Sequence, residues 1–377
     1  MDSNKLALEL HKQYKGKIST ALRDIPDSKA KLSAYYSPGV AAVSRQIAER
    51  QETMRDYCWT NNLVAIISDG SAVLGLGNIG PKAAMPVMEG KAMLFKHFAG
   101  IDAVPIVLNV HTPEEIIATV KAIAPSFGGI NLEDIAAPQC FEIEEKLKEA
   151  LDIPIMHDDQ HGTAVVVLAG LINATKVVGK KLQDCKIVVV GAGAAGTAIM
   201  KLLHLYANPQ IITVDSKGIV SKDRTDLNSA KKELLEFTNP NNISGNLQDA
   251  LVGADIFIGV SQANILTKEM VKKMSKQPIV FALANPNPEI SPELAQEAGV
   301  AILATGRSDY PNQVNNAVAF PGIFRGALDN NVTKITDLHK IAAAEAIASL
   351  VDSPSLQNII PSVFDERLVS KIAGQIK

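Results

Sequence analysis

The chain has 377 residues, of which 47% are hydrophobic and 20% are charged, and its formal net charge is −3. This length exceeds what one small core needs and predicts a globular protein of two domains. The slight acidity argues against nucleic acids and membranes as partners, and the sequence has no apolar run of about 18 residues that would span a bilayer. Cys58, Cys140 and Cys185 are widely spaced without a CxxC pair. They predict free thiols in a reducing cytoplasm, not a disulfide framework or a zinc site.

Helix and strand patterns alternate through the first 160 residues. Helices are expected over 5–15, 40–56, 83–98, 113–124 and 139–151, and strands over 63–67, 103–110, 127–131 and 153–156. Asp69-Gly70-Ser71 directly follows the first strand and predicts a hairpin at that point. The alternation as a whole favours an α/β fold with a parallel sheet and helices packed on it.

A different strand pattern begins after residue 175. Residues 186–190 form a continuous β-branched run, typical of a central parallel strand that is buried on both faces. Further strands are expected over 211–214, 256–259, 279–282 and 301–304, with helices near 225–236, 267–274, 291–298 and 337–351. The second part of the chain therefore predicts a doubly wound parallel sheet.

A glycine motif directly follows the 186–190 strand and predicts a dinucleotide site. Its residues are Gly191, Ala192, Gly193, Ala194, Ala195 and Gly196, and a helix is expected to follow them. The first glycine allows a tight turn, the second lets a pyrophosphate approach the backbone, and the third allows close packing of helix on strand. Asp215 ends the next strand, where its carboxylate would accept the ribose hydroxyls and repel a 2′-phosphate. This favours NAD over NADP, although Lys217, Lys222 and Arg224 follow closely and would bind a 2′-phosphate if the loop turned back.

A second match to GxGxxG, at 75–80, lacks this context. It follows the hairpin signal, and Pro81 comes directly after its third glycine. We interpret it as a backbone turn that positions the next helix, with nucleotide binding as the alternative.

The segment 153–170 places a polar cluster between two apolar stretches. His157-Asp158-Asp159-Gln160-His161-Gly162-Thr163 separates a short strand from an apolar helix. Buried charges are costly unless they are paired or metal-bound, and the adjacent carboxylates of Asp158 and Asp159 would repel each other. A divalent metal would offset this repulsion. The alternative is an ordinary helix cap that faces solvent.

Seven motifs in order carry a resemblance to a known family. They are Tyr-Tyr-Ser-Pro-Gly-Val-Ala at 35–41, the glycine turn at 75–80, Val-Met-Glu-Gly-Lys at 87–91, Asn-Leu-Glu-Asp-Ile at 131–135, the polar cluster at 157–163, Ala-Asn-Pro at 284–286 and the stretch 315–322. The chain resembles the malic enzymes in their compact bacterial form, over nearly its whole length. The resemblance implies oxidation of L-malate with NAD or NADP, decarboxylation of the resulting oxaloacetate to pyruvate, and use of Mg²⁺ or Mn²⁺.

The resemblance also implies how the chain is organised. An N-terminal α/β substrate and dimerisation domain is expected over 1–160. A Rossmann-type NAD-binding domain is expected over 161–377, with its last helices packing back on the first domain. The partners implied are the small-molecule substrate and a second copy of the chain, as a homodimer.

The chemistry of malate oxidation can be compared with these residues. Loss of CO₂ leaves an enolate, whose oxygen needs a cation. Glu133, Asp134 and Asp159 supply three carboxylates, the ligands that a hard divalent ion prefers. Without a metal, Glu133 and Asp134 would only be the acidic start of a helix.

The resemblance assigns the remaining roles. Lys91 is similar to the family's base for the C2 hydroxyl, and burial near a metal would lower its pKa; by residue type alone it would be an exposed helix lysine. Asp158 would orient Lys91. Tyr36 is similar to the acid that protonates C3, with a core tyrosine as the alternative.

Two asparagines and one serine complete the expected site. Asn285 and Asn316 are similar to residues that bind the substrate carboxylate together with Lys91, and Ser261 would lie against the cofactor. Ala72 stands where larger family members carry a carboxylate-binding arginine, so another group must hold that carboxylate.

Four alternatives remain open from the sequence. The same site would serve an oxaloacetate decarboxylase or a malolactic enzyme. A malate-binding regulator conflicts with the complete set of catalytic residues, and a plain NAD-binding module leaves the acidic segment at 131–163 unexplained.

Overall fold

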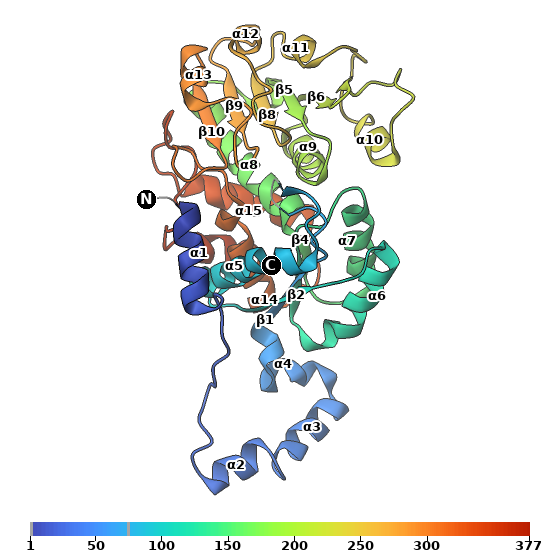
Figure 1. Cartoon of the computed structure of the whole chain (residues 1–377), viewed down its shortest axis with the longest axis vertical. Coiled ribbons are helices and arrows are strands. Elements are labelled where there is room, and N and C mark those ends of the chain that lie inside the picture. Colours follow the sequence, from blue (N-terminus) through green and yellow to red (C-terminus); the bar gives the residue numbers. More distant parts are fainter. Residues whose placement is uncertain (1–2, 74–75) are drawn as a thin grey trace.

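The computed structural model describes residues 3–73 and 76–377. It contains two β-sheets of mainly parallel strands with a helix between them (Figure 1). The first sheet contains β1 (Leu63–Ser68), β2 (Asp102–Val107), β3 (Gly129–Leu132) and β4 (Ile155–His157). Their order is β2-β1-β3-β4, and all neighbours are parallel. The alternating helices and strands of the sequence thus form the expected α/β fold.

Successive side chains of β1 pack on opposite faces of this sheet. Ala65 and Ile67 contact the core formed with α6 (Pro113–Ile123) and α7 (Gln139–Ala150). Val64 and Ile66 face a larger core that includes α5 (Pro81–Ala99). Both faces of the sheet are covered, as parallel strands require.

The predicted hairpin at Asp69-Gly70-Ser71 is wrong. β1 pairs with β2 in parallel, so the chain must cross over through α5 before it returns to the sheet. Gly70 has φ +72°, and a Cβ placed on it would lie 2.4 Å from the carbonyl carbon of Gly80. The turn residues therefore close a loop onto the start of α5 and do not join two strands.

The strands of the second sheet have the spatial order β10-β9-β8-β5-β6-β7. β5 and β8 are parallel neighbours, and from them the chain adds later strands on either side, so the strand order reverses there. This is the expected Rossmann arrangement, with the short β7 as an antiparallel edge strand. Its strands are β5 (Lys186–Val190), β6 (Gln210–Asp215), β7 (Gly218–Ile219), β8 (Ile256–Gly259), β9 (Ile279–Ala282) and β10 (Ile302–Thr305). Its helices are α9 (Ala194–Ala207), α10 (Ser229–Leu234), α11 (Leu247–Ala250), α12 (Lys268–Val271) and α13 (Pro292–Glu297).

The helix α8 (Asp158–Val177) joins the two sheets. The apolar side chains of α8 at 164–169 and 171–172 belong to one core that also contains Ile66 of β1 and Val189 of β5. The C-terminal helices α14 (Phe320–Asp329), α15 (Asp337–Ser349) and α16 (Leu368–Ala373) contribute to the same core. The predicted domain boundary after residue 160 falls in the first turn of α8, and it stays a prediction.

The C-terminal helices return to the first half of the chain. Phe320 and Phe324 of α14 stack edge-on against Phe95 of α5, with ring centroids 4.7 and 5.3 Å apart. Arg325 also donates to the side chain of Asn62 at 2.7 Å. The end of the chain therefore helps to hold α5 in place.

The helix α1 (Ser3–Tyr14) lies beside α5, and Lys17, just after it, donates to the Pro86 carbonyl at 2.8 Å (Figure 1). The following helices α2 (Lys29–Tyr35), α3 (Val40–Glu49) and α4 (Met54–Tyr57) project from the rest of the molecule (Figure 1). The single helix predicted over 40–56 is wrong, because Arg50 adopts an extended backbone that ends α3. Neither α2 nor α3 buries a residue anywhere along 29–49.

The remaining short 3₁₀ helices lie at Gln51–Thr53, Trp59–Asn62, Ala124–Ser126, Leu182–Asp184 and Asn316–Val318. Among the described helices, none is both long enough and apolar enough to cross a membrane.

Candidate active site

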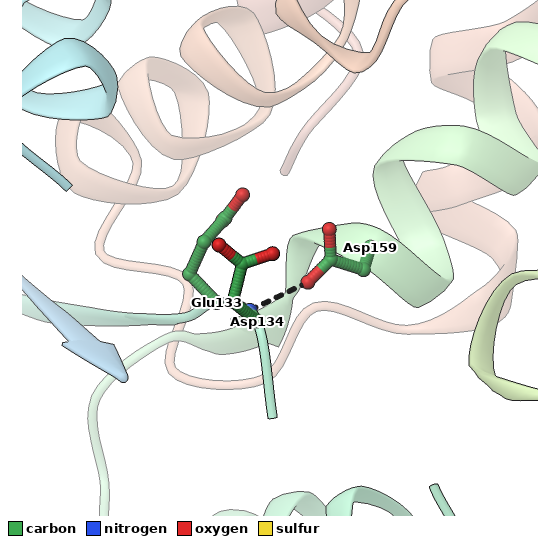
Figure 2. A group of neighbouring side chains, drawn as sticks. All are labelled: Glu133, Asp134 and Asp159. Atoms are coloured by element: carbon green, nitrogen blue, oxygen red, sulfur yellow. Dashed lines mark hydrogen bonds between the residues drawn. The ribbon is translucent and has the colours of Figure 1, made fainter. Parts of the chain in front are cut away.

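Three carboxylates converge where β3 and β4 end. Glu133 and Asp134 directly follow β3, and Asp159 lies in the first turn of α8, directly after the neighbouring β4 (Figure 2). One oxygen from each side chain lies within 4.8 Å of the others. Asp134 has a left-handed backbone with φ +54°, and its N–H donates to Asp159 Oδ2 at 2.7 Å. The structure thus brings the three predicted metal ligands together, and the positive end of the α8 dipole favours the negative charge there.

Lys91 of α5 lies directly against this group. Its side chain is only 7% exposed, and its Nζ contacts Asp158 Oδ2 at 2.5 Å and Glu133 Oε1 at 2.8 Å. The Phe320 ring covers it, with the centroid 4.3 Å from Nζ. Lys91 is therefore a buried lysine paired with carboxylates, not the exposed helix lysine of the alternative interpretation.

The charges around Lys91 reverse the expected shift of its pKa. Burial alone would lower the pKa, but Asp158, Glu133 and Asp159 together raise it. Burial also raises the pKa of Asp158 to about 6, although Lys91 opposes this. The lowered pKa predicted for Lys91 depends on a metal beside it as well as on burial, and it stays a prediction. Lowering it requires an added positive charge among the carboxylates.

Asn316 lies beside the first turns of α8, whereas Asn285 lies on the loop after β9. A Cβ placed on Gly162 would lie 3.1 Å from Asn316 Cβ and 1.8 Å from Asp158 Oδ1. Asn285 is exposed after β9 and lies against Gly306, which follows β10. Both asparagines are thus at the carboxyl ends of strands or beside α8, where α/β sheets bind ligands.

The glycine turn after β5 has the geometry that a dinucleotide needs. Gly191 has φ +115°, and a Cβ on Gly196 would lie 1.8 Å from the Gly191 carbonyl oxygen. Gly193 precedes α9 and has open space where a side chain would be. The helix therefore starts close against β5, with its free N–H groups directed toward the expected pyrophosphate. In the other glycine motif, Gly75 lies outside the described residues, and Gly80 caps α5 just before Pro81.

Comparison with known proteins identifies the family. The family model for the malic enzyme N-terminal domain matches residues 15–148, and the model for the malic enzyme NAD-binding domain matches residues 160–376. The chain belongs to the malic enzyme family. It is an oxidoreductase with an NAD-binding domain of the Rossmann type.

Individual malic enzymes are similar over most of their length. The chain is 55% identical to the bifunctional malic/malolactic enzyme of Bacillus subtilis, over 98% of this chain and 91% of that protein. It is 57% identical to an NAD-dependent malic enzyme of Geobacillus stearothermophilus, over 95% and 75% of the two chains. The crystal structure of an NAD-dependent malic enzyme from Thermotoga maritima superposes with a TM-score of 0.95 at 53% identity, covering 98% of each chain.

Glu289 is a buried residue of this malic enzyme that the sequence did not single out. It is fully buried, and its carboxylate accepts the N–H of Ser261 at 3.2 Å and that of Ala284 at 3.0 Å. A Cβ on Gly259 would lie 2.3 Å from the Glu289 carboxyl carbon. Glu289 therefore ties the loop after β8, where Ser261 is exposed, to the loop that carries Asn285. Only its position directly after Asn-Pro-Asn-Pro hinted at a role.

Glu144 of α7 was also missed, and it holds the start of α8. It accepts the His157 N–H at 3.1 Å, and it contacts His161 Nε2 at 2.8 Å and Lys148 Nζ at 2.6 Å. Burial would raise its pKa, but His161 and Lys148 hold that pKa well below the ordinary range. The ionised Glu144 thus fixes the turn that carries Asp158 and Asp159. Only the four-residue spacing of Glu144 and Lys148 signalled this pairing.

Tyr36 is the predicted site residue that the single chain does not bring to the others. It ends α2 and is 71% exposed on the projecting segment (Figure 1). The alternative interpretation of Tyr36 as a core tyrosine is therefore wrong, and its role as the acid stays a prediction. Ala72, by contrast, lies at the site, because its N–H donates to the Asp134 carbonyl at 3.0 Å.

Proposed function

We propose that this malic enzyme oxidises L-malate at C2 with NAD and decarboxylates the oxaloacetate to pyruvate, using Mg²⁺ or Mn²⁺ held by Glu133, Asp134 and Asp159. The observation that carries the proposal is the convergence of three carboxylates on one point. One oxygen from each of Glu133, Asp134 and Asp159 lies within 4.8 Å of the others, and Glu133 and Asp158 also pair with Lys91. Hard oxygen donors brought this close together suit a divalent cation.

Each protein group then has a place in the reaction. When bound, the metal would polarise the C2 oxygen during hydride transfer and decarboxylation. Lys91 would take the proton of the C2 hydroxyl in its neutral form, which needs a bound cation to offset the carboxylates that raise its pKa. Asp158 would orient Lys91 through its contact with Nζ. Asn285 and Asn316 would hold a substrate carboxylate. The glycine turn at 191–196 and Ser261 would position NAD across from them.

Metal binding can be tested without turnover. Mn²⁺ titrated into the protein gives a loss of free-ion EPR signal, and Asp134→Asn is expected to weaken that binding at least tenfold, because a ligand oxygen is replaced. Asp365→Asn is the matched control, since Asp365 pairs with Arg367 near the C-terminus. Equal Mn²⁺ affinity in the wild type and in Asp134→Asn would contradict the proposed metal site.

The N-terminal segment, residues 6–59, favours a homodimer. More than half of the exposed large hydrophobic side chains among the described residues lie between Leu6 and Trp59. Exposed apolar surface of this extent marks a binding surface, and helices α2 and α3 bury nothing of their own. We propose that this segment packs on a second copy of the chain, and that Tyr36 reaches the active site of that copy, where it would protonate C3.

Mixing two inactive variants tests this arrangement. Tyr36→Phe and Lys91→Ala are each expected to lose activity as homodimers. Co-expressed heterodimers regain part of it, because one of their two sites combines an intact Tyr36 with an intact Lys91. If Tyr36 served its own chain, each heterodimer would keep a defect in both sites and no activity would return. A purified Tyr36→Phe protein with full activity would remove Tyr36 from the mechanism.

We also propose that the enzyme acts in the cytoplasm, which the three free cysteines Cys58, Cys140 and Cys185 support. The malolactic alternative follows from the name of the Bacillus subtilis relative, so an activity assay must measure lactate beside pyruvate.

A further inference from the structure

A closed cluster of charges lies at the end of β6, where the adenosine ribose of the cofactor would bind. Arg224 Nη1 and Nη2 contact the two oxygens of Asp215 at 2.7 and 3.1 Å. Lys231 Nζ adds a contact to Asp215 Oδ2 at 2.5 Å. The Asp215 side chain is only 6% exposed. Both of its oxygens are therefore engaged by cations, and its charge does not face the ribose unopposed.

Asp226 holds the other edge of the same guanidinium. Arg224 Nε donates to Asp226 Oδ1 at 2.9 Å, and Nη2 donates to Oδ2 at 2.7 Å. Lys217 Nζ also contacts Asp226 Oδ2 at 2.9 Å. The cluster thus contains three cations and two carboxylates. Asp226 is the more accessible of the two carboxylates, with 32% of its side chain exposed against 6% for Asp215.

We infer that this cluster, and not Asp215 alone, selects between NAD and NADP, with Asp226 as the specificity-determining residue. The inference rests on the proposed use of a nicotinamide cofactor. A 2′-phosphate is a dianion that an arginine fork and a lysine bind well. Asp226 occupies the N–H groups of Arg224 that such a phosphate would need, and its charge repels the phosphate. Removing Asp226 frees Arg224 Nε and Lys217 Nζ, and it removes the charge that repels the phosphate.

Binding of cofactor fragments tests this without turnover. Adenosine 2′,5′-bisphosphate and AMP are titrated calorimetrically against the wild type, Asp226→Asn and Arg224→Gln. Asp226→Asn is expected to bind the bisphosphate about tenfold more tightly, with AMP affinity unchanged, because one competing charge-assisted pair is lost. Arg224→Gln is expected to lose the gain when combined with Asp226→Asn. Lys231→Gln removes the other cation that pairs with Asp215 and leaves the pairs of Arg224 intact.

Asp365→Asn is the matched control, because Asp365 accepts a similar pair of hydrogen bonds away from the nucleotide. Arg367 Nε donates to Asp365 Oδ1 at 3.0 Å, and Nη2 donates to Oδ2 at 2.7 Å. It should change neither affinity. Equal effects of Asp226→Asn on both fragments, or an unchanged bisphosphate affinity in that variant, would overturn the inference. These titrations need no malate or metal, so failure of the proposed reaction would leave their result interpretable. The ratio of kcat/KM for NADP to that for NAD should rise in Asp226→Asn by a similar factor.

Discussion

Gly162→Ala is expected to inactivate the enzyme by displacing Asp158. An alanine Cβ at this position would lie 1.8 Å from Asp158 Oδ1, one turn earlier on α8. The Asp158 side chain is fully buried and pairs with Lys91, so it can move away only by weakening that pair. Breaking one charge-assisted contact costs about 1.5–3 kcal/mol, and replacing a helical glycine returns about 1 kcal/mol. We expect a net loss of about 0.5–2 kcal/mol of unfolding free energy and a fall of a few degrees in Tm.

The expected loss of activity is larger than the loss of stability. A displacement near 1 Å at a reacting group lowers rates about 100-fold, so kcat for malate oxidation should fall by about this factor. Gly374→Ala is the control, because its Cβ would make only ordinary contacts, the nearest 3.4 Å from the Ser370 carbonyl oxygen. The double variant Gly162→Ala/Asp158→Asn should lose little more than Asp158→Asn alone if the effect acts through Asp158. Unchanged kcat in Gly162→Ala would refute the reasoning that Asp158 must contact Lys91.

Three further predictions follow from buried groups. Glu289→Gln is expected to lower unfolding free energy by about 1–3 kcal/mol, because one of two backbone N–H groups loses its acceptor, and to raise the KM for NAD; thermal unfolding and kinetics measure both. Glu144→Gln is expected to weaken Mn²⁺ binding about 10–100-fold by loosening the start of α8, and an unchanged affinity would contradict this. Burial raises the pKa of Cys140 to about 12 and that of Cys185 to about 11, so neither forms the reactive thiolate at pH 8. In the native protein at pH 8 we expect a thiol reagent to modify the half-buried Cys58, and to modify the other two only after denaturation.

Local patterns accounted for most of the fold and much of the site. The β-branched run at 186–190 and the glycines after it predicted a buried parallel strand and a close helix start, both of which the structure shows. The carboxylates at 133–134 and 159 came together because the ends of adjacent parallel strands meet at one sheet edge. The strand and its glycine turn depend on local geometry, whereas the meeting of the carboxylates followed from the predicted parallel sheet and from the family resemblance.

Features that depend on distant partners could not be predicted from the sequence. The raised pKa of Lys91 follows from three carboxylates of other elements, which only the fold brings to it. The pairing of Arg224 and Lys231 with Asp215 depends on how the loop after β7 returns. The hairpin signal at Asp69-Gly70-Ser71 described a real turn, but the partner strand was decided by the packing of α5. Tyr36 carries a clear motif, yet it lies exposed and away from the other site residues of its own chain, which the motif did not indicate.

The most direct test of the proposed function is product formation from L-malate, followed at the NADH absorbance band with pyruvate and lactate assayed in the same samples. The enzyme with Mn²⁺ and NAD is expected to form NADH and pyruvate in equal amounts, and Lys91→Ala is expected to form neither. Lactate without net NADH would show a malolactic reaction on the same site. Tight NAD binding without any of these products would contradict the roles proposed for Lys91 and the three carboxylates.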